Sequence, residues 1–309
     1  MPTKKSNIVV VGSSNTDMII KLQHIPRAGE TVLGGEFLTA AGGKGANQAV
    51  AASRAGGRVS LIARLGSDIL GDQAIAGFIS DGIDISHIAR ERRLASGAAL
   101  IFVARNGENS IAVAPGANGR LSPADVKKAR ALITEARILL MQLETPLDTV
   151  HAAARLAASK GVRVILNPAP ARKLPDSLLR QVSILTPNES EAERLTGIRL
   201  TSIAAAKKAA ARLRQRGVQT VILTLGARGA LIADEQDARL IPGFKVKAVD
   251  TTAAGDVFNG ALAVALTEGR PIDQAVRIAN AAAAISVTRW GAQPSAPTRR
   301  SIEKFLKTH

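Results

Sequence analysis

Cysteine and tyrosine are both absent from this 309-residue sequence, and aromatic residues make up only 2% of it. The lack of cysteine excludes disulfide bonds, thiolate metal sites and a cysteine nucleophile. The scarcity of aromatic rings leaves few platforms on which the bases of a single-stranded nucleic acid could stack. No apolar stretch is long enough to span a bilayer, and residues 1–7 carry no apolar core of a secretory leader. We therefore expect a soluble, cytoplasmic protein.

Acidic residues are few for a chain with so many basic ones. Asp and Glu number 25 against 41 Lys and Arg, which gives a formal net charge of +16. The basic residues are scattered, and Lys208, Arg212 and Arg216 fall four apart, as on the solvated face of a helix. We expect this charge to attract anionic small molecules, without a specific nucleic-acid partner. Histidine is equally sparse, and its four residues show no metal-ligand spacing: His24, His87, His151 and His309.

Alternating apolar runs and alanine-rich segments dominate what is present. Apolar residues make up 46% of the chain, enough for a substantial core. Buried strands are expected at residues 8–11, 59–63, 138–141, 162–166 and 221–224. Helices are expected at 46–55, 69–81, 147–160, 203–216, 255–268, 272–289 and 298–307. This alternation predicts an α/β fold with a mainly parallel central sheet and helices on both faces.

Two stretches, residues 18–40 and 96–114, break the alternation. Both look like β segments, with turn signals at 26–29 and 106–109 and no helix between the strands. We expect them to form a small β-sheet lid that projects from the main body. The sequence shows no internal repeat or long linker, so we expect one domain over residues 1–309.

The first candidate site follows the first predicted strand, at Asn15 and Asp17. In open α/β sheets, ligands bind beyond the carboxyl ends of the strands. A carboxylate and an amide two residues apart could hold neighbouring hydroxyl groups of a ligand. The alternative is an ordinary turn capped by an Asx side chain.

The second candidate is the glycine-rich segment GGKGANQ at residues 42–48. It is not a P-loop, because Leu38 stands at the expected first glycine and Gly45 replaces the Ser or Thr. Glycines at a helix start allow close backbone approach and leave free N–H groups, and Lys44 and Asn47 would add donors. A simple turn explains the glycines equally well.

The third candidate is DTTAAGDVFNG at residues 250–260, where a strand passes into a helix. The N–H groups of Ala253, Ala254 and Gly255 would be unpaired there and could form an anion hole for a migrating phosphoryl group. Asp256 could accept a proton from an attacking hydroxyl, and the helix dipole is expected to keep its carboxylate ionised. The alternative is a helix-start carboxylate with no chemical role.

Two further segments could serve a nucleotide. The TPNESE stretch at 186–191 places carboxylates at a helix start, where they suit the helix dipole or hold water on Mg²⁺. The TLGARG stretch at 224–229 is a strand followed by a glycine-bounded turn, which fits either a nucleotide site or a plain hairpin.

Together these segments resemble the ribokinase-like (PfkB) family of sugar kinases, over about Ile8 to Phe305. The specific matches lie at residues 42–49, 167–171, 186–189, 250–261 and 291–295. The segments at 42–49 and 167–171 look like those of ribose-phosphorylating members rather than of adenosine or 6-phosphofructose kinases. The resemblance implies transfer of phosphate from ATP to O5 of D-ribose, with Mg²⁺ and an activating K⁺, in a homodimer joined through the lid.

The same resemblance implies roles for individual residues. Asp256 would be the catalytic base, with Ala253, Ala254 and Gly255 as the anion hole; many relatives carry Gly at the position of Ala253. The sugar would be held by Asn15, Asp17, Gly43, Lys44, Asn47 and Glu144. ATP would contact Asn188, Thr224, Leu225, Gly226, Ala227, Arg228, Gly229, Gly255 and Asn280, and Glu191 would organise Mg²⁺ indirectly. The K⁺ site would comprise Asp250, Thr252, Ser286, Arg289, Gly291 and Ser295.

Two other functions stay open on the residues alone. One is a kinase of another furanose sugar or of a nucleoside, and the other is a non-catalytic sugar-binding regulator. The presence of Asp256 argues against the regulator, because a sensor needs no base. The absence of an evident aromatic platform argues against a nucleoside.

Overall fold

A nine-stranded sheet forms the centre of the computed structural model, which describes residues 8–309. The leader prediction for residues 1–7 lies outside the described residues. In spatial order the strands are β13 (Ala238–Pro242), β12 (Gly229–Ala233), β11 (Thr220–Thr224), β10 (Ile184–Leu185), β9 (Arg163–Leu166), β8 (Ile138–Met141), β1 (Ile8–Val11), β4 (Val59–Gly66) and β5 (Ile88–Glu91). All neighbours from β11 to β5 are parallel, whereas β12 and β13 form an antiparallel hairpin at one edge.

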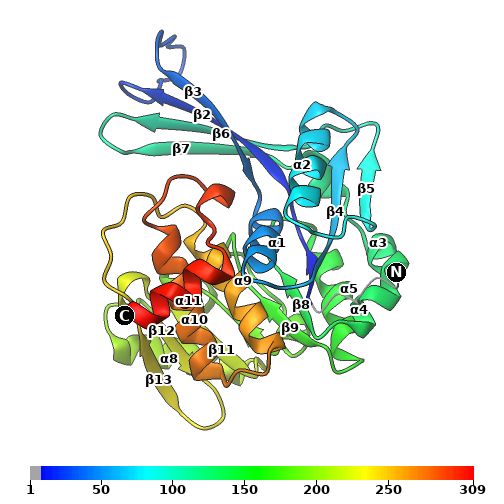
Figure 1. Cartoon of the computed structure of the whole chain (residues 1–309), viewed down its shortest axis with the longest axis vertical. Coiled ribbons are helices and arrows are strands. Elements are labelled where there is room, and N and C mark those ends of the chain that lie inside the picture. The colour runs from blue at the N-terminus through cyan, green and yellow to red at the C-terminus, as the bar shows by residue number, and fades with distance from the viewer. Residues whose placement is uncertain (1–7) are drawn as a thin grey trace.

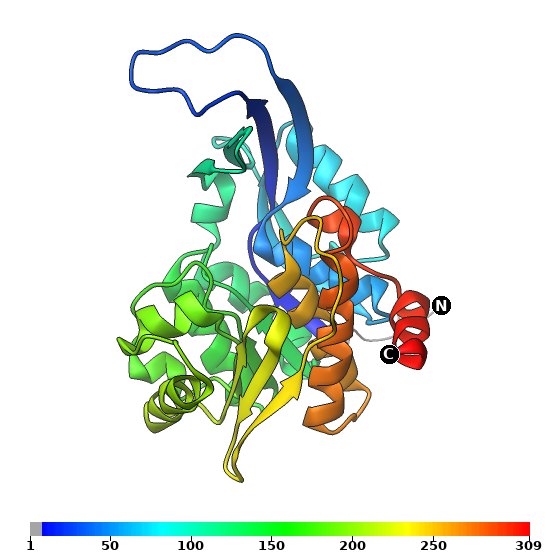
Figure 2. The same ribbon diagram turned by 90° about the vertical axis from the view of Figure 1, so that its left-hand side faces the viewer.

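Helices cover both faces of this sheet, because its strands are apolar on both sides (Figure 2). In β1, Ile8 and Val10 belong to the core on one face, and Val9 and Val11 to the core on the other. The first face packs against α1 (Lys44–Arg54), α2 (Ile69–Ser80), α9 (Ala254–Thr267), α10 (Ile272–Ser286) and α11 (Arg299–Thr308). The second packs against α3 (Pro123–Lys128), α4 (Arg130–Glu135), α5 (Leu147–Ala158), α6 (Asp176–Leu179), α7 (Glu189–Thr196) and α8 (Ile203–Gln215). The predicted mainly parallel α/β fold is confirmed.

Helices α1 and α9 lie side by side in the middle of the first face (Figure 1). Their contact depends on Gly260, where an added Cβ would lie 2.7 Å from both Ala51 Cβ and Ala52 N. This close approach brings the first turn of α1 next to the first turn of α9. Both turns lie at the carboxyl end of the parallel strands, where ligands bind in such sheets.

The lid is a separate four-stranded sheet at one end of the molecule (Figure 1). Its order is β3 (Glu36–Gly42), β2 (Asn15–Leu22), β6 (Gly97–Ala104) and β7 (Asn109–Ala114), with β2 and β6 parallel and the outer pairs antiparallel. The two segments expected to form a second small sheet do so. That the whole chain acts as one domain stays a prediction.

Several expected boundaries differ from those observed. The helix expected over 272–289 ends at Ser286, and the following residues form a loop that carries η3 (Gln293–Ser295). The segment 224–229 contains the short η2 (Gly226–Arg228), which joins β11 to antiparallel β12. The hairpin interpretation of this segment is therefore correct at the level of the fold.

Candidate active site

Asp256 lies in the first turn of α9 and is 4% exposed. One carboxylate oxygen, Oδ1, accepts from Gln48 Nε2 at 2.9 Å, and Oδ2 accepts from Asn47 Nδ2 at 3.1 Å. Burial raises the pKa of Asp256, although Lys44 and the two amide donors oppose this. The expectation that the helix dipole keeps the group at its ordinary acidity is wrong, because burial outweighs it. A raised pKa brings a general base closer to neutral pH.

Ala253 begins α9 in the left-handed conformation, at φ 59°, and no other non-glycine residue in 8–309 has a positive φ. The turn directs the Ala254 N–H to the carbonyl of Thr251 at 3.3 Å. The prediction that all three N–H groups at 253–255 are unpaired is therefore wrong for Ala254. A non-glycine residue held in this conformation stores strain of the kind found at functional sites.

The N-terminus of α1 is capped from within the protein. Glu144 Oε2 accepts from Lys44 N at 2.9 Å and from Ser13 Oγ at 2.5 Å, and Gly45 N donates to Ser13 Oγ at 3.3 Å. The N–H groups expected to be free for a ligand are thus already bonded, which corrects that expectation. The glycine serves backbone packing instead, since a Cβ on Gly45 would lie 2.6 Å from Gly12 Cα. Glu144 itself is brought to the site by this cap.

Asn15 and Asp17 lie in strand β2, two residues apart, so both side chains lie on one face of the lid sheet. The Asx-turn alternative is therefore wrong. Asn15 Oδ1 accepts from Asn118 Nδ2 at 2.8 Å. Asp17 lies over Gly42, where a Cβ would overlap its carboxylate. Burial, followed by the charge of Glu144, raises the pKa of Asp17 to about 6.

A cavity of about 200 Å³ lies between the carboxyl ends of the strands and the start of α9. Lys44 is its one lysine or arginine, and the pKa of Lys44 is raised by the charge of Asp256 against the opposing effect of burial. Asn15, Asp17, Asn47 and Glu144 lie outside its lining. The lining residues are Lys44, Asn167, Ala169, Thr186, Asn188, Glu191, Thr224, Thr251, Ala253, Ala254, Gly255, Asp256 and Asn259.

Asn188 and Glu191 form a capping box at the start of α7. Asn188 Oδ1 accepts from Glu191 N at 2.8 Å, and the Glu191 carboxylate accepts from Asn188 N and Asn188 Nδ2, both at 2.9 Å. Burial raises the pKa of Glu191. The carboxylate thus has a structural role in the helix and also lies against the cavity.

The other residues expected at a nucleotide gather beside the cavity rather than in it. Thr224 N donates to Pro187 O at 2.9 Å, which ties β11 to the segment before α7. Leu225 is buried, whereas Gly226, Ala227 and Arg228 are exposed, and Arg228 pairs with Glu189. Asn280 Nδ2 donates to the carbonyls of Ile241 and Pro242, both at 3.2 Å, at the end of β13. Gly229 pairs with Pro242, so Asn280 lies near this turn.

Asp250 ties together the two loops expected to hold a monovalent cation. Its carboxylate accepts from Thr252 N at 2.8 Å and from Gly291 N at 2.9 Å, and these bonds lower its pKa despite partial burial. Within 8–309, no basic side chain is paired with Asp250. The hydroxyls of Ser286 and Ser295 bond within their own turns, which leaves backbone carbonyls as the oxygens they could offer. Trp290, between Arg289 and Gly291, is 73% exposed.

A set of buried amides behind Asp256 was not identified from the sequence. Gln48 Nε2 contacts both Asp256 and Asn167 Oδ1, Gln142 Nε2 donates to Gln48 Oε1, and Asn167 Nδ2 donates to Thr186 O. Two signals were available: Gln48 belongs to the glycine-rich segment, and Asn167 directly follows a buried strand.

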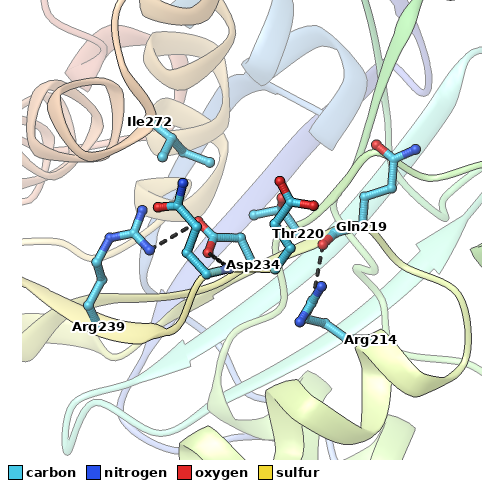
Figure 3. Close-up of a pocket in the computed structure, with 8 residues that line it drawn as sticks. Arg214, Gln219, Thr220, Asp234, Arg239 and Ile272 are labelled. Atoms are coloured by element: carbon cyan, nitrogen blue, oxygen red, sulfur yellow. Dashed lines mark hydrogen bonds and ion pairs between the residues drawn. The ribbon is translucent and has the colours of Figure 1, made fainter.

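A larger cavity of about 600 Å³ lies at the opposite, amino end of β11 (Figure 3). Arg239 pairs there with Asp234 at 3.0 Å and with Asp273 at 2.6 Å, and Arg214 Nε donates to Gln219 O at 3.1 Å. Both arginines are already bonded to the hairpin and the neighbouring helices. This cavity braces the edge of the sheet and is remote from Asp256.

Residues 8–309 contain no helix that is long and apolar enough to cross a membrane. Over the same part of the chain, no three His, Asp or Glu residues are grouped closely enough to bind a metal ion by themselves. An ion at the cavity would therefore need oxygen ligands from elsewhere, such as phosphate or water.

Comparison with known proteins gives one consistent result. A ribokinase of Haemophilus influenzae is 47% identical over 303 residues, covering 98% of this chain and 99% of that protein. A deoxyribokinase of Salmonella typhi is 38% identical, covering 97% and 98%. The structure of Arabidopsis thaliana ribokinase complexed with ribose and ATP is 32% identical with a TM-score of 0.91, covering 98% and 99%. Residues 5–299 match the pfkB family of carbohydrate kinases, so the chain belongs to that family.

Proposed function

We propose that this chain transfers the γ-phosphate of ATP to O5 of D-ribose, giving D-ribose 5-phosphate and ADP. The observation that carries the proposal is the buried Asp256 at the start of α9, in a cavity with Lys44 and beside Asn47. A carboxylate of raised pKa next to a lysine suits proton removal from an alcohol beside a phosphate. Relatives named ribokinase supply the sugar.

The sugar is held between the lid and α1. Asn15, Asp17, Asn47 and Glu144 offer oxygen and amide groups to a polyol, together with the Gly43 backbone and the Lys44 ammonium. The Asn118 bond to Asn15 Oδ1 orients the Asn15 amide so that its NH₂ is free to donate. Asp256 then takes the proton from O5 as O5 attacks the γ-phosphorus and ADP leaves.

ATP is placed by the turn at 224–229, by Asn188 and by Asn280, with its γ-phosphate directed to the cavity. Lys44 and the start of α9 at 253–255 stabilise charge on the transferring phosphoryl group. Asp256 and Glu191 both line this cavity and repel each other, so a divalent cation fits the charge there. Mg²⁺ bound with ATP neutralises phosphate charge, and Glu191 would hold it through water.

A monovalent cation fits the loop at Asp250. A carboxylate held by two backbone N–H groups, with carbonyls of residues 286, 289 and 295 nearby in sequence, offers K⁺ oxygen ligands without a competing basic side chain. The full set would be Asp250, Thr252, Ser286, Arg289, Gly291 and Ser295. K⁺ there fixes the loop that precedes the start of α9. Phosphorylation should be faster in K⁺ than in Na⁺ or a bulky organic cation, and equal rates would remove this part of the proposal.

The lid supports a homodimer. On the lid face that carries Asp17, the register aligns Leu38, Ile19, Ile101 and Ile111 in one row across all four strands. Ile111 is 56% exposed in the single chain. A second lid laid over this row would bury it, as exposed apolar patches of this kind usually require. A location in the cytoplasm stays a prediction from the sequence.

The activity is tested by ADP release with D-ribose, 2-deoxy-D-ribose, other pentoses, hexoses and adenosine. We expect the highest kcat/KM with D-ribose. Because deoxyribokinases are among the relatives, 2-deoxyribose is the informative competitor. A higher value for 2-deoxyribose or adenosine would replace ribose as the substrate, and no turnover of any sugar would leave a binding protein.

A further inference from the structure

Gln48 is fully buried on α1, directly behind the carboxylate of Asp256. Its amide nitrogen lies 2.9 Å from Asp256 Oδ1 and 3.2 Å from Asn167 Oδ1, and its amide oxygen lies 2.6 Å from Gln142 Nε2. Both ends of this amide are therefore engaged. Residues of this kind contact no substrate, yet they determine where the base stands.

The direction of these hydrogen bonds follows from a backbone group. Thr186 presents a carbonyl, which can only accept, so the Asn167 amide must direct its nitrogen there at 3.0 Å. Asn167 then presents its oxygen to Gln48, and Gln48 must donate. The same Gln48 nitrogen faces Asp256, so the base receives an N–H that cannot be exchanged for a carbonyl oxygen.

Asn47, on the other side of the base, is arranged differently. Its nitrogen donates to Asp256 Oδ2 at 3.1 Å, but its amide oxygen is buried without a hydrogen-bond partner. A half-turn of this amide would present that oxygen to Asp256. The Asn47 amide can therefore stabilise Oδ2 as a carboxylate oxygen or, after rotation, accept a hydrogen bond from it as a hydroxyl. A locked amide faces one oxygen of the base, and a switchable amide faces the other.

We infer that Gln48 is a positioning residue for the base, and that the proton from the substrate alcohol goes to the Asp256 oxygen facing Asn47. This inference rests on the proposed function for the reaction itself. In that step the O5–H bond breaks and the Oδ2–H bond forms, while O5 bonds to the γ-phosphorus and ADP departs. Gln48 holds Oδ1 as an acceptor throughout. The charged groups that also act on Asp256 include Lys44 on α1, Glu144 after β8, Glu191 on α7 and Asp17 on β2.

The test measures the titration of Asp256 directly. Carboxyl ¹³C NMR of the whole protein, with the Asp256 signal assigned from Asp256→Asn, is compared between the parent, Gln48→Met and Gln142→Met. Both methionines replace a buried glutamine of the same amide cluster, but only Gln48 touches the base. We expect Gln48→Met to raise the pKa of Asp256 by about one to two units, since a hydrogen bond to a charged group is lost. Gln142→Met should change it by much less.

Kinetics supply the second readout. In Gln48→Met the acid limb of the kcat–pH profile should move upward with the pKa, so that kcat near neutral pH falls about 10-fold or more while KM for ATP stays near the parent value. Gln142→Met should keep the parent profile. If the methionine variant does not fold, Gln48→Glu keeps the shape of the side chain. The titration of Asp256 together with the introduced carboxyl group should then rise further, because two carboxyl groups share the site.

An unchanged Asp256 titration in Gln48→Met, with a fall in melting temperature equal to that of Gln142→Met, would show a structural role only and overturn the inference. The titration requires no turnover, so it decides the role of Gln48 even if ribose proves not to be the substrate. Failure of the parent to phosphorylate any sugar would count against the proposed function alone.

Discussion

Five charged side chains from five different segments converge at one end of the sheet: Asp17, Lys44, Glu144, Glu191 and Asp256. Four are acidic and one is basic, and burial raises the pKa of Asp17, Glu191 and Asp256. In the free protein this arrangement is unfavourable, because like charges share a poorly solvated space. Ligands that bring hydroxyl donors and a divalent cation relieve it. The site is therefore tuned for binding at the expense of its own stability.

Replacing the base should separate chemistry from binding. Asp256→Asn keeps the shape of the side chain but removes the oxygen that takes the proton. We expect kcat to fall by about 10²–10⁴-fold, with dissociation constants for sugar and nucleotide much less affected. The measurement is kcat beside calorimetric binding of each ligand. A variant with near-parent kcat would contradict the role of Asp256.

Asp17 should cost stability at neutral pH. Its pKa is raised from 3.8 to about 6, so the folded state holds the proton more tightly than the unfolded chain does. Stability then falls as pH rises through the window between these two values, and the full cost is present at pH 7. Asp17→Asn removes the charge and should raise the free energy of unfolding at pH 7 by about 1–3 kcal/mol, while sugar affinity drops.

Urea unfolding at pH 4 and pH 7 checks this sign. The gain in Asp17→Asn should be present at pH 7 and largely absent at pH 4. A gain of equal size at both pH values would assign it to packing rather than to ionisation.

Side-chain roles were predictable from the sequence where a motif carries them, as for Lys44, Asn47 and Asp256. Asn118 and Gln48 were missed because their roles are defined by hydrogen bonds to partners 103 and 208 positions away. The state of Asp256 was misjudged for a related reason. A helix start is visible in a sequence, but the burial that reverses its effect on the pKa is not.

At the scale of elements, the contact between α1 and α9 assembles the site. One helix carries Lys44, Asn47 and Gln48, and the other carries Asp256. The glycine at 260 lets the two helices approach closely. Any side chain there separates the base from its amide donors.

Gly260→Ala should therefore lower both stability and kcat. Its Cβ would meet α1 at 2.7 Å, so the helices must move apart by several tenths of an ångström. We expect a loss of about 1–3 kcal/mol in the free energy of unfolding and a lower kcat. The matched control is Gly77→Ala in α2, where an added Cβ meets nothing within 4 Å. That change should stabilise by about 0.5–1 kcal/mol and leave kcat unchanged.

Most of these elements could be predicted, because buried strands such as Ile8–Val11 and helices such as Ile203–Gln215 have strong apolar patterns. The two-residue β10 and the edge hairpin β12–β13 were not predicted as such. A strand of two residues has too few positions to show a pattern, and the sheet order depends on contacts between distant segments.

Across the whole molecule, charge is divided unevenly between the two faces of the sheet. Residues 120–216, which include helices α3 to α8, contain 18 basic and 8 acidic residues, a net +10 of the total +16. The positive field is thus concentrated on one helical layer, which the sequence alone did not localise. Long-range attraction of anionic substrates follows from it and weakens with salt.

Assembly through the lid is the prediction at this scale. Ile111→Asp places a charge in the exposed apolar row of the lid and should shift the protein from dimer to monomer in analytical ultracentrifugation. Lys307→Asp, on exposed α11 far from the lid in sequence, is the charge-matched control and should leave the oligomeric state unchanged. A parent protein that sediments as a monomer would refute lid-mediated dimerisation.

The placement of the one tryptophan gives the chain an optical reporter of its own. With no tyrosine in the sequence, near-ultraviolet emission excited at the indole band comes from Trp290 alone. Its neighbour Gly291 donates to Asp250, so an ion that draws on this carboxylate must move the peptide next to the indole. Adding K⁺ to the protein without substrates should therefore change the emission with a saturable dependence, and a bulky organic cation should not. In Asp250→Asn the K⁺ response should weaken or vanish, and an identical response in that variant would place the ion elsewhere.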